Sequence, residues 1–351
     1  MSHDDNTPAA LDVAVDPGRG AIGAMAAEVE RSGFGGMFLG ETSHDPLLML
    51  AAASQTTSTL RLGTSIYVAF ARSPMVAAIA ANDVQTLSAG RLTLGLGSQI
   101  KPHITRRFSM PWSQPAARMR EYVSALRAIW SSWENSTPLR FDGQFYTHTL
   151  MTPMFDPGPN PYGNPPVIVA GVGEQMTRVA GEVADGLLVH SFVTERYLRE
   201  VLLPNVHSGL AACGRRRDDF EVIVSPMFAT GSTEAEVAEA REFVRGQIAF
   251  YGSTPAYRGV LDLHGWGGLH EELHRLSKDG EWKQMSQTVP DEVVDEFAVS
   301  APVGRAAAEI GRRWGPIADR ISVTAATDTA LSAWRDAPKM YGGARSAVLE
   351  Q

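Results

Sequence analysis

PVIVAGVGEQMTRVAGEVADGLLVH, residues Pro166–His190, holds a strand, a turn, a helix and a second strand in one stretch. The apolar segment Val167–Ala170 fits a strand that is buried on both faces. The turn Gly171-Val172-Gly173 follows, and an amphipathic run leads to Ala184 and the second strand. Glycines let backbone amides approach an anion where a helix begins, so this turn is a candidate phosphate site, although a plain strand-to-helix turn also favours glycine.

The same alternation of short apolar strands and helical patterns recurs along the chain. The pattern predicts strands at Leu11–Val15, Gly36–Gly40, Leu60–Ile66, Arg91–Leu96, Val167–Ala170, Gly186–Val189, Glu221–Phe228 and Arg320–Thr324. It also predicts a long helix from Pro115, a charged helix over Thr233–Phe250 after the seventh strand, and a helix over Pro302–Trp314. Eight βα units predict an α/β fold of the (β/α)8 TIM-barrel type, since a doubly wound sheet rarely needs eight strands.

Two segments interrupt this alternation, and we interpret them as insertions after strands 4 and 7 of a single domain spanning residues 1–351. The first covers about 139–165, where Phe141-Asp-Gly-Gln-Phe145 predicts a hairpin with a type I′ turn. The second covers about 251–297.

Composition limits the classes of function. The chain has 351 residues, of which 44% are hydrophobic and 20% charged, as in soluble globular enzymes. Its net charge of −8 argues against nucleic-acid and anionic-membrane partners, which attract basic surfaces. The single Cys213 excludes an internal disulfide, and Met1–Asn6 lack the features of a signal peptide, so we expect a cytoplasmic protein.

In a TIM barrel the functional groups stand at the carboxyl ends of the strands. This rule selects the residues that follow strands two to six: Glu41 and Thr42, Ser65–Tyr67, Gly97–Lys101, Gly171–Met176, and His190 with Ser191.

Several motifs in order along residues 10–324 resemble the bacterial-luciferase-like family of flavin- and deazaflavin-dependent oxidoreductases. The most specific is LRLGTSI (Leu60–Ile66) followed by DVQTLSAGRLTLGLG (Asp83–Gly97). Three later motifs also match landmarks of the family: FDGQFY (Phe141–Tyr146), VAGVGE (Val169–Glu174) and ADG (Ala184–Gly186). Within it the chain is most similar to the branch that uses coenzyme F420, although some relatives take FMN.

The resemblance implies positions for the cofactor. The bond Ser65–Ile66 would be a nonprolyl cis peptide that supports the bent reduced ring, and the phosphate would lie at the amides of Gly171–Glu174. The expected cofactor-binding residues are Thr42, Ser65, Ile66, Ser98, Gln99, Lys101, Ala170, Gly171, Val172, Gly173, Glu174, Gln175, Met176 and Arg258. The candidates to hold a phosphate or glutamyl tail are Lys101, Arg106, Arg107 and Arg258. The candidates to cover the ring are Ile66, Tyr67, Phe70 and Phe192, with core packing as the alternative.

The chain departs from the F420 branch at the proton-transfer position. Members often carry Asp-His after strand two, whereas this chain has Glu41-Thr42, with His44 two residues later. The candidates for the proton donor or acceptor are therefore Glu41, His44, His103 and His190, and any of the histidines is equally explained as a satisfied polar group at the barrel rim.

A second motif suggests different chemistry. His270-Glu-Glu-Leu-His274 matches the HExxH pattern of zinc proteases, in which two histidines share a helix face. Leu269, Leu273 and Leu276 instead indicate the packing face of an amphipathic helix, and we expect no metal.

The leading hypothesis is an oxidoreductase, expected to be a homodimer, that moves a hydride between coenzyme F420 and a small organic substrate. The alternatives are an FMN-dependent monooxygenase, a barrel that binds flavin without turnover, and the zinc protease.

Overall fold

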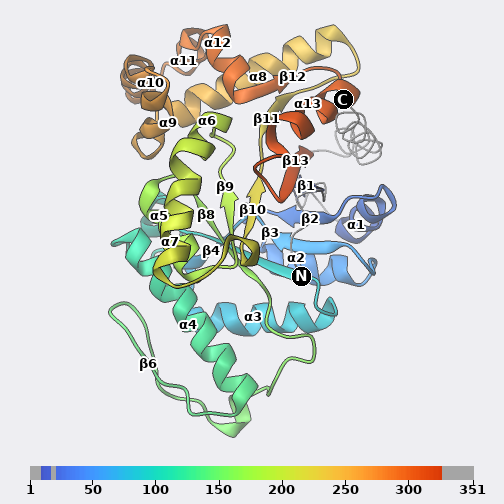
Figure 1. The fold of residues 1–351 in the computed structure, drawn as a ribbon, viewed down its shortest axis with the longest axis vertical. Coiled ribbons are helices and arrows are strands. Elements are labelled where there is room, and N and C mark those ends of the chain that lie inside the picture. The colour runs from blue at the N-terminus through green and yellow to red at the C-terminus, as the bar shows by residue number, and fades with distance from the viewer. Residues whose placement is uncertain (1–8, 17–20, 326–351) are drawn as a thin grey trace.

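The computed structural model describes residues 9–16 and 21–325. Eight parallel strands close into a barrel surrounded by helices, as the sequence predicts (Figure 1). The strands follow one another in chain order, and β1 pairs with both β2 and β13, which closes the ring. The barrel strands are β1 (Ala10–Val15), β2 (Gly36–Leu39), β3 (Arg61–Thr64), β5 (Leu92–Gly97), β8 (Val167–Gly171), β9 (Gly186–Val189), β10 (Glu221–Val224) and β13 (Arg320–Ala325).

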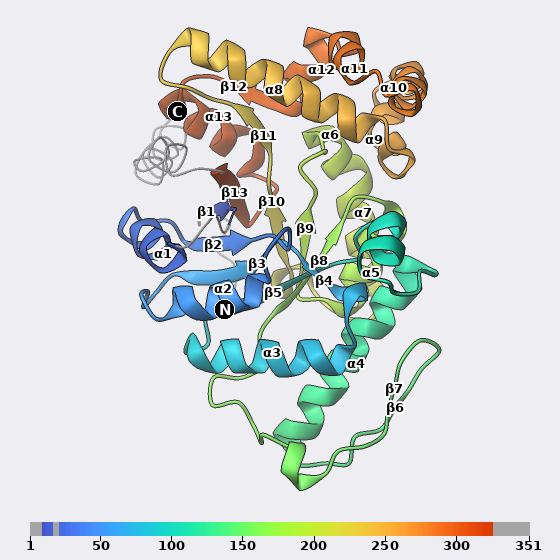
Figure 2. The ribbon, with the colours of Figure 1, turned by 180° about the vertical axis from the view of Figure 1, so that it is seen from behind.

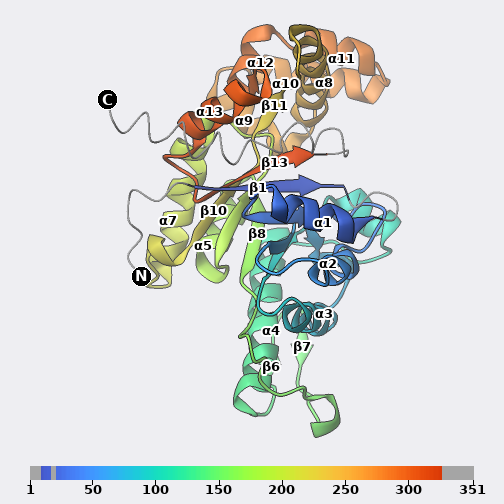
Figure 3. The same ribbon diagram turned by 90° about the vertical axis from the view of Figure 1, so that its right-hand side faces the viewer.

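Helices connect these strands on the outside of the barrel. Figure 3 shows the strands between α1–α3 on one side and α5 with α7 on the other. The connecting helices are α1 (Ile22–Arg31), α2 (Pro46–Ser54), α3 (Pro74–Leu87), α4 (Pro115–Asn135), α5 (Glu174–Val183), α6 (Glu195–Tyr197), α7 (Leu203–Ala212) and α13 (Val303–Trp314). Short helical turns are η1 (Ala69–Ala71), η2 (His103–Arg107), η3 (Pro153–Phe155), η4 (Leu198–Leu202), η5 (Arg217–Asp219) and η6 (Pro255–Tyr257). No helix among the described residues is both long and apolar enough to cross a membrane.

Charged side chains fill the amino-terminal end of the barrel. Asp12 is fully buried and forms a two-pronged ion pair with Arg320, and Arg61 forms another with Glu221, with both N–O distances at 2.7 Å. Above this layer the barrel centre is apolar and holds Phe38, Ile168, Leu188 and Ile223. Gly63 makes room for Phe38, since a Cβ there would lie 2.3 Å from the ring. The amino-terminal end is therefore filled, and only the carboxyl end remains for a ligand.

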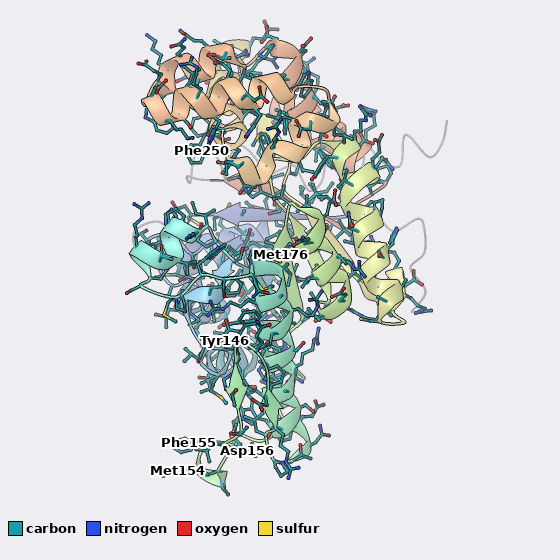
Figure 4. All side chains as sticks on the ribbon, turned by 90° about the vertical axis from the view of Figure 1, so that its left-hand side faces the viewer. Tyr146, Met154, Phe155, Asp156, Met176 and Phe250 are labelled. Carbon is teal, nitrogen blue, oxygen red and sulfur yellow. The ribbon has the colours of Figure 1, made fainter. Side chains whose placement is uncertain are left out.

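The first insertion contains a hairpin, but its turn is not the predicted type I′. Strands β6 (Phe141–Asp142) and β7 (Thr147–His148) are joined by four residues, and neither Gly143 nor Gln144 has the positive φ that a type I′ turn requires. The carboxylate of Glu121 on α4 instead accepts three consecutive backbone N–H groups, from Gln144 to Tyr146, at 2.6–2.9 Å. The hairpin projects from α4, and Met154 and Phe155 lie at the far end of the molecule (Figures 2 and 4).

The second insertion begins earlier than the sequence pattern predicts. Pro226 lacks an N–H group and interrupts the predicted strand Glu221–Phe228, so β10 ends at Val224. The chain then forms a separate two-stranded sheet from β11 (Met227–Ala229) and β12 (Ala298–Ser300). Between these strands lie α8 (Glu234–Gly252), α9 (Arg258–Leu263), α10 (Gly267–Asp279), α11 (Trp282–Thr288) and α12 (Asp291–Phe297).

The helix predicted over Thr233–Phe250 is present as α8, but its place as the regular helix of the seventh βα unit is wrong. Helix α8 packs against β11 and against α10, α11 and α12, and the whole group lies beyond one end of the barrel (Figures 1 and 2). The capping box formed by Thr233 and Glu236 explains why a helix starts there, but local signals do not say what the helix covers.

Candidate functional site

The carboxyl ends of the barrel strands surround a cavity of about 630 Å³. Residues at or just beyond the end of every barrel strand line it, and the second insertion adds two tyrosines. The lining residues are Ala14, Val15, Asp16, Gly40, Thr42, Ser65, Ile66, Gly97, Ser98, Gln99, Ile100, Ala170, Gly171, Val172, Gly173, Met176, Leu188, Val189, His190, Ser191, Ser225, Tyr251, Tyr257 and Thr324. The volume is in the range of cavities that bind small molecules and cofactors.

The amino terminus of α5 opens into this cavity. Gly173 is the N-cap residue and has an extended backbone, with φ −104° and ψ 157°, and no side chain caps the helix. The first N–H groups of a helix have no partner within the helix, and they carry a partial positive charge. Tyr197 donates its hydroxyl hydrogen to the carbonyl of Val172 at 3.2 Å, which fixes the turn. This end of the cavity suits a phosphate group.

The end of β3, which is separated from β8 by β5 alone, contains the cis peptide bond that the resemblance implies. The bond Ser65–Ile66 is cis and nonprolyl, and it divides the predicted strand Leu60–Ile66 into β3 and the short β4 (Tyr67–Val68). Ser65 and Ile66 both line the cavity. Gly97 on β5 makes space for Ile66, because a Cβ at Gly97 would lie 2.2 Å from the end of the isoleucine side chain.

Gln99 carries an unusual backbone conformation at the cavity edge. Its φ of 58° is in the left-handed region, which residues other than glycine rarely adopt. The side chain Oε1 accepts the N–H of Ile100 at 3.0 Å, so a local hydrogen bond accompanies the conformation. Such outliers are frequent at ligand sites, and Gln99 lines the cavity beside Ser98.

Glu41, a candidate for proton transfer, is already fully engaged. Arg72 contacts both of its carboxylate oxygens, at 2.6 and 2.9 Å, and the N–H of Val68 donates to it at 2.7 Å. Only 7% of its side chain is exposed, and it lies outside the cavity lining, although its neighbour Thr42 belongs to it. Glu41 thus joins the end of β2 to β4 in this structure.

Of the three candidate histidines, only His190 lines the cavity. His44 is partly buried and His103 is exposed on η2, and both lie outside the lining. The Nδ1 atom of His190 accepts the backbone N–H of Phe192 at 3.0 Å, so the ring hydrogen is on Nε2. Nε2 lies 3.3 Å from the hydroxyl of Tyr257, with which the ring also stacks. Burial lowers the pKa of His190 to about 4, so the ring is neutral near pH 7.

The other expected cofactor residues divide into two groups. Ala170, Gly171, Val172 and Met176 line the cavity with Gly173. Lys101, Glu174 and Gln175 are exposed outside the lining, and Arg258 is paired with Asp262 at 3.1 Å and Glu271 at 3.3 Å. Arg106 and Arg107 are also exposed outside it, whereas Tyr67, Phe70 and Phe192 are buried in the core.

Sequence reasoning missed several lining residues. Asp16, Ser225 and Thr324 follow or end barrel strands, so the strand-end rule applied to the first, seventh and eighth strands would have found them. Tyr251 and Tyr257 come from the end of α8 and from η6, and no local signal indicates that this insertion folds back onto the cavity.

The two histidines of the HExxH motif have a structural role. The Nδ1 atoms of His270 and His274 lie 2.7 Å and 2.9 Å from the carbonyl oxygens of Gly252 and Ser253. Carbonyls only accept, so both histidines donate to the carboxyl-terminal end of α8. No group of three or more potential metal ligands occurs among residues 9–16 and 21–325.

These features define a closed (β/α)8 barrel with a ligand cavity at the carboxyl ends of its strands. The chain belongs to the luciferase-like monooxygenase family, whose model matches residues 6–323.

An uncharacterised protein of Mycobacterium tuberculosis is 56% identical over 303 residues, which cover 86% of this chain and 88% of that protein. A 5,10-methylenetetrahydromethanopterin reductase of Archaeoglobus fulgidus is 28% identical over 259 residues, covering 72% and 73%. Among solved structures, the coenzyme F420 dependent tetrahydromethanopterin reductase from Methanopyrus kandleri has the same fold. It superposes with a TM-score of 0.76 at 18% identity, covering 94% of this chain and 98% of that one.

Proposed function

We propose that this protein transfers a hydride between coenzyme F420 and a small organic substrate. The observation that carries the proposal is the uncapped amino terminus of α5, which opens into the cavity at the carboxyl ends of the strands. Such a helix end suits the single phosphate of a deazaflavin cofactor, and the small residues around it leave room for a ring system. The reductase of Methanopyrus kandleri, which is described as coenzyme F420 dependent, supports F420 as the cofactor.

The lining residues would divide the work of binding. Gly171, Val172 and Gly173 would hold the phosphate, and Ile66 would contact the ring. When bound, the cofactor supplies the electron pair and the hydride, and the protein supplies orientation and exclusion of water. His190 is the one candidate for proton transfer that lines the cavity, but its neutral ring with a hydrogen-bonded Nδ1 favours a donor over a base.

The runner-up is an FMN-dependent monooxygenase, which the description of the family favours. The same helix end would suit the phosphate of FMN, so the cavity does not separate the two. A barrel that binds the cofactor without turnover is the third candidate, because Glu41 is held by Arg72.

Titration of the purified protein with F420 and with FMN, followed by cofactor fluorescence, tests the proposal. We expect micromolar or tighter binding of F420 and weaker binding of FMN. Reduced cofactor in air then separates the enzyme classes, because a monooxygenase consumes oxygen while a hydride carrier does not. If neither cofactor binds at micromolar concentrations, the proposal fails.

We also propose that the chain forms a homodimer through α2 and α3. These neighbouring helices expose Leu48, Val76, Ile79 and Leu87, each 47–70% accessible. Clustered apolar side chains of this size are typical of interfaces between subunits. Light scattering after gel filtration should give about twice the chain mass, and Ile79→Glu should lower it toward one chain; a monomeric wild type would refute the dimer.

A further inference from the structure

Three aromatic rings form one edge of the cavity. His190 follows β9, whereas Tyr251 and Tyr257 belong to the second insertion. His190 stacks on Tyr257 with ring centres 4.7 Å apart and meets Tyr251 edge to face at 4.9 Å. Figure 4 shows this insertion above the barrel, with Phe250 labelled next in sequence to Tyr251 and Met176 at the level of the strands. The edge is therefore shared by the barrel and the insertion.

The hydrogen bonds at this edge run in one direction. The N–H of Phe192 donates to Nδ1 of His190, and Nε2–H of His190 then donates to the hydroxyl oxygen of Tyr257 at 3.3 Å. The hydroxyl hydrogen of Tyr257 remains, and no acceptor for it is found among the described residues. Burial raises the pKa of Tyr257 to about 12, so this hydrogen is retained near pH 7.

A hydroxyl that already accepts a hydrogen bond becomes a better donor, because chains of hydrogen bonds polarise one another. Burial raises the pKa of Tyr251, and a hydrogen bond with Ser191 partly offsets that shift. The hydroxyl of Tyr257 thus accepts from His190 and has its hydrogen available for a ligand in the cavity.

We propose that Tyr257 is a catalytic residue whose hydroxyl donates a hydrogen bond to the oxygen atom of the substrate, and that the substrate is a small uncharged carbonyl compound or the corresponding alcohol. This inference rests on the proposed function. Asp16 is the one formally charged side chain among the described residues of the lining, so an anionic substrate would meet repulsion there. His190 acts as a positioning residue, because its Nε2–H bond orients and polarises the hydroxyl of Tyr257.

The reaction balances without a further oxidant or reductant. In carbonyl reduction a hydride, with its electron pair, adds to the carbonyl carbon, and the carbon–oxygen π pair moves onto oxygen. The reduced cofactor would supply this hydride and would release one proton to solvent on its two-electron oxidation, and one proton from solvent completes the alcohol, so no net proton is consumed. Tyr257 stabilises the negative charge that develops on oxygen, as a donor in an oxyanion hole does.

Infrared spectroscopy of a bound ketone tests the inference. Acetophenone labelled with 13C at the carbonyl is added to protein loaded with oxidised F420, and the matched hydrocarbon ethylbenzene serves as the ligand without oxygen. We expect the carbonyl stretch to fall on binding to the wild type, and to stay near its value in an apolar solvent in Tyr257→Phe. His190→Phe keeps a ring against Tyr257 but removes the donor, so the stretch should lie between these values.

Kinetics supply a second readout. With reduced F420, Tyr257→Phe should lower kcat for a ketone about 100-fold while changing its KM much less. Tyr162→Phe, which removes a hydroxyl from an exposed residue outside the cavity, is the matched control and should behave as the wild type.

Cofactor titration keeps the two proposals distinguishable. If the wild type fails to bind F420, the proposed function fails. The other case is that F420 binds equally well to the wild type and to Tyr257→Phe. If acetophenone then does not bind, or its carbonyl stretching frequency is the same in both proteins, the inference is overturned and the proposed function stands.

Discussion

Replacing Gly173 with aspartate tests whether the amino terminus of α5 binds an anion. The backbone of Gly173 is extended, with φ −104° and ψ 157°, a conformation open to any residue. A Cβ at this position would meet no atom within 4 Å. The substitution therefore introduces a charge without steric conflict or backbone strain.

The expected effects on folding and on binding have opposite signs. Aspartate is a favourable N-cap residue and should stabilise α5 by up to about 1 kcal/mol. Its carboxylate would occupy the N–H groups that we assign to the phosphate and would repel that phosphate at close range. Two unit charges about 4 Å apart repel by roughly 1 kcal/mol in water and about 4 kcal/mol near a protein surface. F420 affinity should thus fall roughly fivefold to almost a thousandfold.

The assay combines fluorescence titration with F420 and thermal unfolding of the unloaded protein. Gly173→Asn is the matched control, because asparagine has the shape of aspartate and caps helices as well, but carries no charge. We expect Gly173→Asn to lose less affinity than Gly173→Asp, with both variants at least as stable as the wild type. Equal F420 affinity in the wild type and Gly173→Asp would refute the assignment of the phosphate to this turn.

Three further outcomes are expected. Asp12→Asn should lower the free energy of unfolding in urea by about 3 kcal/mol, because Arg320 loses its two-pronged partner at the filled barrel end and keeps only Glu221, at 4.0 Å. A loss below about 1 kcal/mol would contradict this. The pKa of His190 is lowered to about 4, so its contribution to stability should be complete above about pH 6.5 and should disappear as the pH falls toward 4. In His190→Gln, the measured free energy of unfolding should therefore depend less on pH between these two values. His274→Ala should leave metal content at zero by elemental analysis and lower stability by about 1 kcal/mol through loss of its bond to Ser253; stoichiometric zinc in the wild type would contradict the structural role.

The sequence predicted the parts of the molecule that local patterns determine. Short apolar strands such as Val167–Ala170 were found because a strand buried on both faces has no polar alternation, and their number indicated the barrel. The rule that ligands bind at the strand ends then selected Gly173 and His190, and both line the cavity. The same rule did not reveal that Arg72 binds Glu41, because 31 residues separate the two partners.

The unpredicted parts depend on contacts between distant segments. The turn after Asp142 differs from type I′ because Glu121 of α4 binds its backbone N–H groups. Helix α8 has a clear start signal, but its partners are other helices of the insertion. The placement of Tyr251 and Tyr257 against His190 follows from that packing, so no local pattern could indicate it.

The two sources of the cavity lining suggest how binding and specificity are divided. The turn before α5 and the Ser65–Ile66 bond belong to the barrel itself, whose strands are held in register by backbone pairing around the ring. Tyr251 and Tyr257 come from an insertion that lies outside that ring of strands. If the barrel binds the cofactor and the insertion contacts the substrate, substitutions in the insertion should alter substrate choice while F420 affinity is unchanged. Tyr257→Phe and Gly173→Asp are therefore expected to have complementary effects, the first on turnover and the second on cofactor binding.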